Sequence, residues 1–353
     1  MALKNLALGV LALASSSAQA QQQQQQQQLD SGRYSIASTV SAEAAARLKL
    51  FGSFLRRAPA PKKPASLEEW DRKRAEGEAF AAQFNKPIVD RLRPTITDER
   101  MGGVPIVRVR PANWRPTGRT LVFIHGGGYV TGSARASIGE VSVMAATSGD
   151  EIVAIEYTKA PRGDWRLATD QVLSVWDALL KTGVDAQSVG LYGGSAGGGL
   201  AAGSVLKMRE RGMPLPGALY LQSPWSDITP TGDTITTLAS ADPLLTSTSL
   251  AWGADLYAAP EDQKNPYVSP VYGDYTKAFP PTLIQVGTRE IFLSHAVREY
   301  QAIRGGGHEA VLDVYEGMPH GFPALFSGTP EGDTAIKRAA DFFRTHLRVS
   351  GGK

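Results

Sequence analysis

The chain has 353 residues, of which 42% are hydrophobic, and its formal net charge is +3. That length is enough for one large α/β domain with a smaller cap. The small positive excess is not gathered into a basic block, which argues against nucleic-acid binding. The chain has no cysteine, so it has no disulfide framework, lipoprotein cleavage motif, cysteine nucleophile or thiolate metal site.

The first 20 residues have the pattern of a secretory signal peptide. Lys4 precedes an apolar run at residues 6–14, and Ala18–Ala20 has the form of a cleavage site. The apolar run is far shorter than the ~20 residues needed to span a bilayer. We therefore expect cleavage near Ala20, export to the periplasm or the medium, and no stable membrane anchor. Residues 21–40, which begin with a glutamine tract, are expected to be a disordered spacer.

Two helices are predicted before the first strand. Residues 41–57 have helical spacing and are followed by a proline-rich segment, which ends the first helix. Ser66 and Glu69 have the spacing of a capping box at the start of the second helix. We expect this helix to run through Phe84 and to end before Pro87.

A cap is predicted from two parts of the chain, residues 41–100 and an insertion at about 227–260. The insertion shows no clear strand, and we expect both parts to lie over the C-terminal edge of the sheet, where open α/β sheets bind ligands. Simple packing of the N-terminal helices at the edge of the core is the alternative. The apolar contacts expected from these helices are Leu50, Phe51, Phe54, Phe80 and Phe84.

Residues 101–353 are predicted to form the catalytic domain. Short apolar strands alternate there with helices, which indicates an α/β fold with a mostly parallel sheet covered on both faces. The strands are expected at residues 104–109, 121–124, 152–155, 189–192, 218–221, 282–286 and 311–315. The helices are expected at residues 138–147, 165–180, 200–211, 294–304 and 334–347.

The segment 191–199 carries the strongest functional signal. Ser195 lies between a predicted strand and a predicted helix, with Gly193 and Gly197 two residues to either side. This G-x-S-x-G pattern is typical of a nucleophile elbow, a tight and strained turn in which side chains at the two glycines would collide with backbone. A phosphate-binding turn is the alternative.

Three consecutive glycines, residues 126–128, follow a predicted buried strand and His125. Glycines allow backbone N–H groups to face a cavity without obstruction by a Cβ atom. Together with the N–H after the nucleophile, such groups form an oxyanion hole, and we expect Gly127, Gly128 and Ala196 to be its donors. His125 is expected to orient this loop rather than to react.

A serine nucleophile needs a base, and the base needs an acid. His320 lies on a loop after the last predicted strand, and Glu290 follows the strand before it. This matches the chain order serine, acid, histidine of such folds. We therefore predict a triad of Ser195, Glu290 and His320, with Asp274 and Asp313 as rival acids.

Together these motifs resemble those of the hormone-sensitive-lipase-like esterases, bacterial lipolytic family IV, within the α/β-hydrolase fold. The resemblance extends from residue 104 to the C-terminus and rests on the segments 125–128, 193–197, 223–227, 265–270 and 320–322. It implies a carboxylic ester hydrolase with an acyl-serine intermediate, a small-molecule ester as substrate, and no cofactor. The lack of a His-rich ligand set argues against a metal site. Homodimerisation stays open.

The sequence departs from the family pattern at several positions. Gly194 stands where relatives have Asp or Thr, so we expect looser packing beside the nucleophile. Glu290 replaces the commoner Asp, and Phe292 and Ser294 stand where relatives often have Leu and Asp. Residues 156–161 are a variant of a family segment expected to be structural.

The sequence sets only loose limits on the size of the substrate. Tyr129, Trp225 and Phe322 are candidates for the pocket wall, although each is also an ordinary core residue type. A modest pocket favours short- to medium-chain acyl esters. A lactone hydrolase that uses the same triad is the alternative. A non-catalytic ligand-binding protein on this scaffold is disfavoured by the intact Ser195 and His320.

Overall fold

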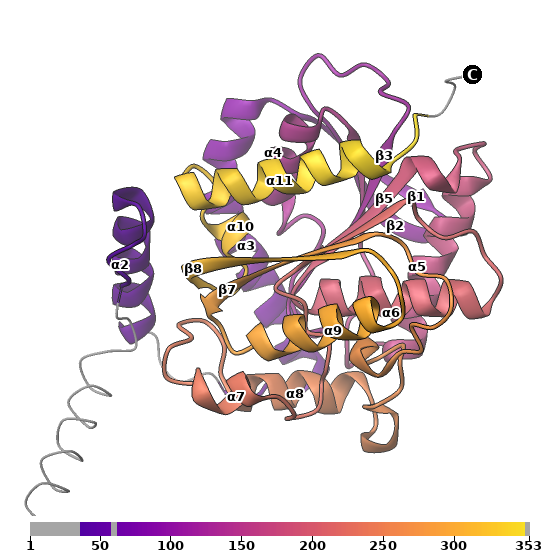
Figure 1. The fold of residues 1–353 in the computed structure, drawn as a ribbon. Helices are drawn as coiled ribbons and strands as arrows, with labels where there is room; N and C mark the ends of the chain where they lie inside the picture. Colours follow the sequence, from indigo (N-terminus) through magenta and orange to yellow (C-terminus); the bar gives the residue numbers. More distant parts are fainter. Residues whose placement is uncertain (1–35, 58–61, 350–353) are drawn as a thin grey trace, which may run out of the picture.

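The structure, a computed structural model, describes residues 36–57 and 62–349 (Figure 1). The predicted signal peptide and most of the predicted spacer lie outside these residues. The side chains of Phe51 and Phe54 also lie outside the described part of the chain. Within the described ranges, no helix combines the length and the hydropathy needed to cross a bilayer.

A single sheet of eight strands forms the centre of the described chain, in the order β1-β2-β4-β3-β5-β6-β7-β8 (Figure 1). β1 and β2 pair antiparallel, as do β2 and β4, and all other neighbours are parallel. The predicted mostly parallel sheet is thus confirmed. The strands are β1 (Thr95–Met101), β2 (Val104–Arg110), β3 (Thr120–Ile124), β4 (Glu151–Ile155), β5 (Val189–Gly194), β6 (Ala218–Gln222), β7 (Thr282–Arg289) and β8 (Ala310–Pro319).

Helices cover both faces of this sheet, and side-chain alternation along the strands divides the core between the two faces. In β3, Val122 and Ile124 belong to the core cluster under α5, α6 and α9, whereas Leu121 and Phe123 belong to the cluster under α4 and α11 (Figure 1). The helices are α2 (Ala42–Arg57), α3 (Leu67–Leu92), α4 (Ile138–Ser148), α5 (Trp165–Leu180), α6 (Ala196–Glu210), α7 (Asp233–Thr237), α8 (Ser247–Tyr257), α9 (Leu293–Gly305), α10 (Phe322–Leu325) and α11 (Pro330–His346).

The predicted strands and helices of residues 101–353 are all present, with ends shifted by at most four residues. β1 is the strand that the sequence does not predict, because most of its side chains are polar and exposed. It is an edge strand that joins β2 through Gly102 and Gly103, whose φ angles of 59° and 80° suit a tight hairpin turn.

The prediction that the second N-terminal helix ends before Pro87 is wrong, because α3 continues to Leu92 with Pro87 inside it. A proline in a helix removes one backbone hydrogen bond and strains the preceding turn. Ile88, Val89 and Leu92 pack against the core cluster under α4 and α11, and burial of these side chains offsets that cost. The predicted cap at Ser66 is present, since its side chain accepts from Glu69 N at 3.2 Å.

The N-terminal helices use other apolar contacts than those expected. Leu50, Phe80 and Phe84 are 68%, 45% and 58% exposed. Instead, Trp70 of α3 is buried against Val130 and Ala160. α2 buries Ala44 and Leu48 against side chains that include Phe322 and Phe326. The N-terminal helices therefore pack at the edge of the core. That they also form a cap over the site remains a prediction.

Candidate active site

Ser195 forms the junction between β5 and α6. Its φ of 56° and ψ of −125° lie in a region that residues with side chains rarely adopt, so the surrounding structure must hold the turn. Backbone hydrogen bonds do so on both sides: Ser195 N donates to Gln222 O at 2.8 Å, and Trp225 N donates to Ser195 O at 3.0 Å. The strand–turn–helix context expected of a nucleophile elbow is therefore present.

The glycines around Ser195 are required by close backbone contacts. A Cβ atom on Gly193 would collide with the backbone of Gly197, and a Cβ atom on Gly197 would collide with Ile124 O. A Cβ atom on Gly126 would lie 2.8 Å from Gly194 O and 3.1 Å from Ser195 Cβ. The three-glycine loop therefore packs directly against the serine turn.

Gly194 differs from these glycines. The nearest atoms to a Cβ atom at this position would be Cδ and Nε2 of Gln222, both at 3.8 Å, which is ordinary van der Waals distance. The backbone beside the nucleophile therefore has room for a side chain. This agrees with the expectation of open packing at Gly194.

The loop after β3 presents unpaired backbone donors. Gly127 and Gly128 have φ angles of 109° and 61°. Gly127 O accepts from Val130 N at 3.1 Å and from Thr131 N at 2.9 Å, which closes the loop into a turn. In the described part of the chain, no acceptor binds the N–H groups of Gly127, Gly128 or Ala196. These are the three N–H groups predicted to bind an oxyanion.

His125 is buried, and its ring is held by stacking and by a hydrogen bond. Its ring stacks on Tyr157 with centroids 4.3 Å apart, and Nδ1 lies 2.8 Å from Gly126 O. A carbonyl oxygen can only accept, so Nδ1 carries the proton. Burial lowers the pKa of His125 to about 4, so the ring is neutral at neutral pH. This supports a role in orienting the loop.

Glu290 and His320 form a hydrogen-bonded pair directly after β7 and β8. His320 Nδ1 donates to Glu290 Oε2 at 2.9 Å, and both side chains are buried. Glu290 Oε1 accepts from Ser223 Oγ at 2.8 Å and from Gly287 N at 2.7 Å. The carboxylate thereby fixes the tautomer of the neutral imidazole with the proton on Nδ1, so that Nε2 of this tautomer can accept a proton.

The rival acids are engaged elsewhere. Asp274 is exposed and accepts from Thr276 N at 3.0 Å and from the Thr276 hydroxyl at 2.6 Å. Asp313 pairs with Arg338 at 2.5 Å, and Gln285 donates to its second oxygen at 3.0 Å. Glu290 alone of the three contacts His320.

Ser195, Glu290 and His320 follow β5, β7 and β8, which together with β6 are neighbours in the sheet. The described residues show no hydrogen bond between Ser195 Oγ and the His320 ring, a contact that often tightens only when substrate binds. Ser223 follows β6, the strand between β5 and β7. Its Oγ donates to Glu290 and accepts from Gly321 N at 3.0 Å, so it links the loops that carry the acid and the histidine. Its position in the segment 223–227 was the only sequence signal for this residue.

The segment 227–260 also contacts the loop that carries Glu290. Asp242 is buried, and its carboxylate accepts from Leu244 N, Leu245 N and Ile291 N at 2.8–2.9 Å. Burial raises the pKa of Asp242 above its usual value. Thr234 Oγ1 donates to Ile291 O at 2.8 Å, and Thr234 N donates to Ser294 Oγ at 2.9 Å. The insertion therefore holds the acid loop by side chains that the sequence did not single out.

The structure does not support the pocket-wall prediction. Tyr129, Trp225 and Phe322 are 0%, 2% and 0% exposed, so they present almost no surface to any cavity. Tyr129 stacks on Trp225 with ring centroids 5.4 Å apart, within the core. Phe322 packs with Tyr315 in the cluster beneath α2. Large aromatic side chains fill cores as readily as they line pockets, and here they fill the core.

Phe292 links this aromatic core to His320. Its ring meets the His320 ring edge-on, with centroids 5.1 Å apart, and stacks on Trp225 with centroids 5.7 Å apart. The imidazole is therefore bounded by the Glu290 carboxylate and by an apolar ring.

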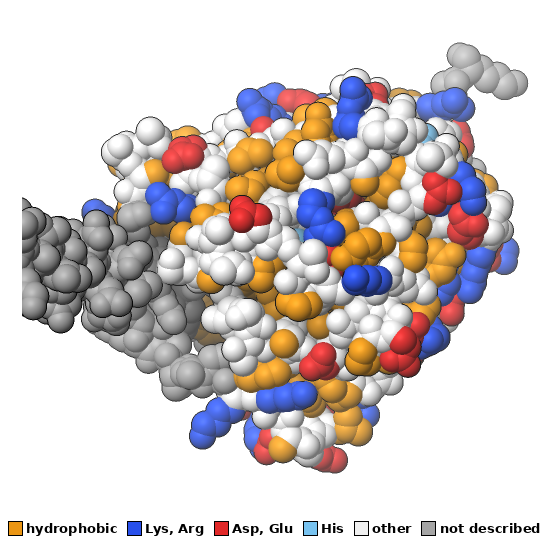
Figure 2. All heavy atoms as spheres, turned by 60° about the horizontal axis from the view of Figure 1, so that its bottom comes forward, with side chains coloured by type: hydrophobic (Ala, Val, Ile, Leu, Met, Phe, Trp, Pro, Cys, Tyr) orange, Lys and Arg blue, Asp and Glu red, His pale blue; other side chains and the backbone are white. Residues whose placement is uncertain are grey.

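On the face that carries α7 and α8, Lys and Arg side chains are interspersed with Asp and Glu, and hydrophobic side chains lie between them (Figure 2). This face has no block of a single charge. It therefore gives no sign of a nucleic-acid surface.

Comparisons with known proteins agree with this geometry. Residues 121–324 match the model of a family described as having the α/β hydrolase fold. The chain is 35% identical to an acetyl-hydrolase of Streptomyces hygroscopicus, over 67% of this chain and 78% of that one. It is 28% identical to an esterase of Acinetobacter venetianus, over 73% of this chain and 87% of that one.

Solved structures are similar over almost their whole length. An esterase from the bacterial hormone-sensitive lipase family has a TM-score of 0.77 and 29% identity, and the match covers 87% of this chain and 99% of that one. The esterase E25 has a TM-score of 0.79 and 30% identity, over 89% of this chain and 96% of that one.

Proposed function

Because the chain belongs to the hormone-sensitive-lipase-like esterases of the α/β-hydrolase fold, we propose that it hydrolyses small-molecule carboxylic esters through an acyl-serine intermediate. The observation that carries this proposal is the Glu290–His320 pair, which follows strands of the same mostly parallel sheet whose strand β5 ends in the strained Ser195 turn. The curated relatives named as esterases support ester hydrolysis as the reaction.

In the proposed reaction, His320 Nε2 takes the proton from Ser195 Oγ as this oxygen attacks the ester carbonyl. Glu290 stabilises the imidazolium that forms, and the N–H groups of Gly127, Gly128 and Ala196 stabilise the oxyanion. When the carbonyl re-forms, the bond to the alkoxide oxygen breaks and His320 protonates the leaving alcohol. Water, deprotonated by His320, then attacks the acyl carbon. The bond between this carbon and Ser195 Oγ breaks, His320 returns the proton to Ser195 Oγ, and the carboxylic acid is released.

The proposed substrates carry short- to medium-chain acyl groups. Two relatives are named acetyl-hydrolase and ethyl acetate hydrolase, which favours the short end of this range. A series of p-nitrophenyl esters from acetate to decanoate, with several lactones, tests the range. We expect kcat/KM to be highest at short acyl chains. A preference for lactones over every ester would favour the alternative activity.

Replacement of the serine tests the mechanism. Ser195→Ala removes the nucleophile, and we expect it to lower kcat for p-nitrophenyl butyrate by at least about 10³-fold in a folded protein. Ser247→Ala, an exposed position in α8, is the matched control and should retain activity. A fluorophosphonate should label the wild type only at Ser195. Wild-type hydrolysis by Ser195→Ala, or labelling at another residue, would contradict the assignment.

Export and homodimerisation are further proposals. The pattern at Lys4, residues 6–14 and Ala18–Ala20 supports cleavage near Ala20. N-terminal sequencing of the protein recovered outside the cytoplasm of a bacterial host tests this cleavage. Sedimentation velocity of the same material tests for a dimer.

A further inference from the structure

One face of α3 lies along the segment that follows the three-glycine loop. Arg74 Nε donates to Val130 O at 2.9 Å, and its Nη2 donates to Ala160 O in the loop after β4. Its Nη1 donates to Asp71 Oδ1 at 2.8 Å, which fixes the guanidinium from the same helix. The Arg74 side chain is only 12% exposed. One side chain thus joins α3 to two loops of the catalytic domain.

The Val130 peptide belongs to the turn that shapes the proposed oxyanion hole. Val130 N donates to Gly127 O, so Arg74 and Gly127 bind the two ends of the same residue. The Trp70 ring, one turn before Arg74, packs against Val130 and Ala160. A displacement of Val130 would therefore move Gly127 and the N–H groups that follow it.

Two further side chains of α3 extend the contact along the chain. Ser133 Oγ donates to Glu78 Oε1 at 3.1 Å. Asn85 Nδ2 donates to Ala136 O at 2.9 Å, and Gly139 N donates to Asn85 Oδ1 at 3.2 Å. Positions 74, 78 and 85 lie on one helical face, so α3 holds the chain from Val130 to Gly139 as a unit.

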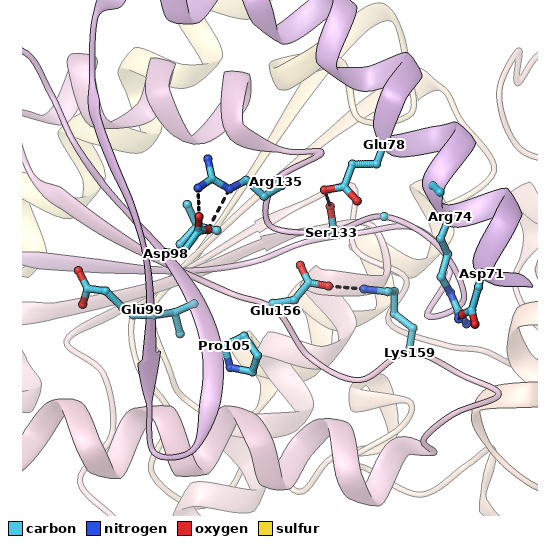
Figure 3. A pocket seen from close by; sticks show the side chains of 14 residues that line it. Asp71, Arg74, Glu78, Asp98, Glu99, Pro105, Ser133, Arg135, Glu156 and Lys159 are labelled. Carbon is cyan, nitrogen blue, oxygen red and sulfur yellow. Dashed lines mark hydrogen bonds and ion pairs between the residues drawn. The ribbon is translucent and has the colours of Figure 1, made fainter.

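A cavity of about 420 Å³ lies between α3 and the β1–β2 hairpin. Figure 3 shows Arg74, Asp71 and Glu78 on the side of this cavity formed by α3. Among the charged side chains of the other walls, Asp98 pairs with Arg135 and Glu156 with Lys159, whereas Glu99 pairs with Arg108 outside the lining. Arg74 lines this cavity on the side of α3, and its guanidinium binds the backbone of two loops.

We propose that Arg74 is a positioning residue for ester hydrolysis: its guanidinium fixes the Val130 carbonyl and thereby the N–H groups of Gly127 and Gly128. The inference rests on the proposed function, because it assumes that these N–H groups bind the oxyanion. Donors that are fixed before the reaction stabilise the transition state most, whereas donors that must reorganise lose part of this stabilisation. Loss of Arg74 should therefore act on kcat more than on KM.

The test compares Arg74→Ala and Arg74→Lys with Arg72→Ala, a matched change on the same helix at a side chain that is 66% exposed. We expect Arg74→Ala to lower kcat for p-nitrophenyl butyrate by about 10- to 100-fold with KM within about twofold. Arg74→Lys should recover only part of the rate, since an ammonium lacks the planar fork that reaches both carbonyls. Arg72→Ala should match the wild type.

Two readouts separate positioning from plain loss of stability. The affinity for a trifluoromethyl ketone, which forms a tetrahedral oxyanion adduct on the serine, should fall by the same factor as kcat/KM. Added guanidinium ion should partly restore the rate of Arg74→Ala and leave Arg72→Ala unchanged. An unchanged kcat in Arg74→Ala, or a loss of rate with unchanged ketone affinity of the folded fraction, would overturn the proposal.

The outcome is also distinguishable from failure of the proposed function. An active Ser195→Ala variant would refute the acyl-serine mechanism itself. An inactive Ser195→Ala together with a fully active Arg74→Ala would leave the mechanism standing and refute only the role of Arg74.

Discussion

The polar groups of the glycine loop and those of the acid loop differ in how many hydrogen bonds they form. On the side of the three-glycine loop, the N–H groups of Gly127, Gly128 and Ala196 have no acceptor among the described residues. On the other side, the Glu290 carboxylate accepts three hydrogen bonds. Unpaired backbone donors cost free energy unless a ligand or water binds them, so the first side must be held rigid by its surroundings.

Each side is held by a different part of the chain outside the sheet. α3 holds the glycine side through Arg74 and Trp70, and the segment 227–260 holds the acid side through Thr234 and Asp242. The difference teaches that the site depends on contacts far from the serine turn. The following substitutions test each side in turn.

Glu290→Gln should have the largest effect. The glutamine oxygen can still accept from Ser223 and Gly287, which turns its NH₂ group toward His320 Nδ1 and forces the proton of the ring onto Nε2. The ring then cannot act as a base, and we expect kcat to fall by about 10⁴-fold with little change in Tm. Asp313→Asn is the control and should remain active. An unaffected rate in Glu290→Gln would point to another acid.

Gly126→Ala should follow in size, because it acts on the glycine side by steric conflict. The new Cβ would meet Gly194 O at 2.8 Å and Ser195 Cβ at 3.1 Å, so the loop or the serine turn must move. We expect a loss of about 10²-fold in kcat, measured with p-nitrophenyl butyrate. Gly77→Ala, at an open position of α3, should keep the rate and stabilise the protein by up to about 1 kcal/mol. Equal rates in both variants would contradict the expected conflict.

Asp242→Asn tests how the insertion holds the acid side. The new amide would place an N–H group against Ile291 N or lose the contacts with Leu244 and Leu245. A buried donor left without an acceptor costs about 1–3 kcal/mol, so Tm should fall. We expect a several-fold lower kcat as the acid loop loosens. Asp255→Asn, exposed on α8, should change neither quantity.

Gly194→Ala should have the smallest effect. Its Cβ would find neighbours only at 3.8 Å, and the backbone angle there is not one that favours glycine. We expect Tm and kcat close to the wild-type values, with stability within about 0.5 kcal/mol. Thermal unfolding and steady-state kinetics check this. A large loss would show that the bare flank of the nucleophile is itself required.

The sequence predicts the sheet and the serine turn because both depend on local pattern. Continuous apolar strands and the glycines around Ser195 are visible in short windows. The polar strand β1 and the continuation of α3 past Pro87 are not, since pairing with β2 and burial of Ile88 decide them. The failed pocket assignment has the same origin, because an aromatic residue type does not specify its neighbours.

The supporting contacts of the site could not be predicted because they join distant positions. Ser223 and Glu290 are 67 residues apart, Asp242 and Ile291 are 49 apart, and Arg74 and Val130 are 56 apart. A single sequence shows which residues can donate or accept, but only the fold shows which of them meet.

The composition of α6 has a consequence for folding experiments. The helix contains several glycines in its first half, has low intrinsic helix propensity, and is buried along most of its length. The stability of this helix must therefore come from tertiary packing. The same packing must hold the strained backbone of Ser195, which precedes the helix. Partly folded chains, in which this packing is incomplete, should therefore have no esterase activity. On refolding from denaturant, esterase activity should return later than far-UV circular dichroism, which makes catalysis a stringent reporter of the completed native state.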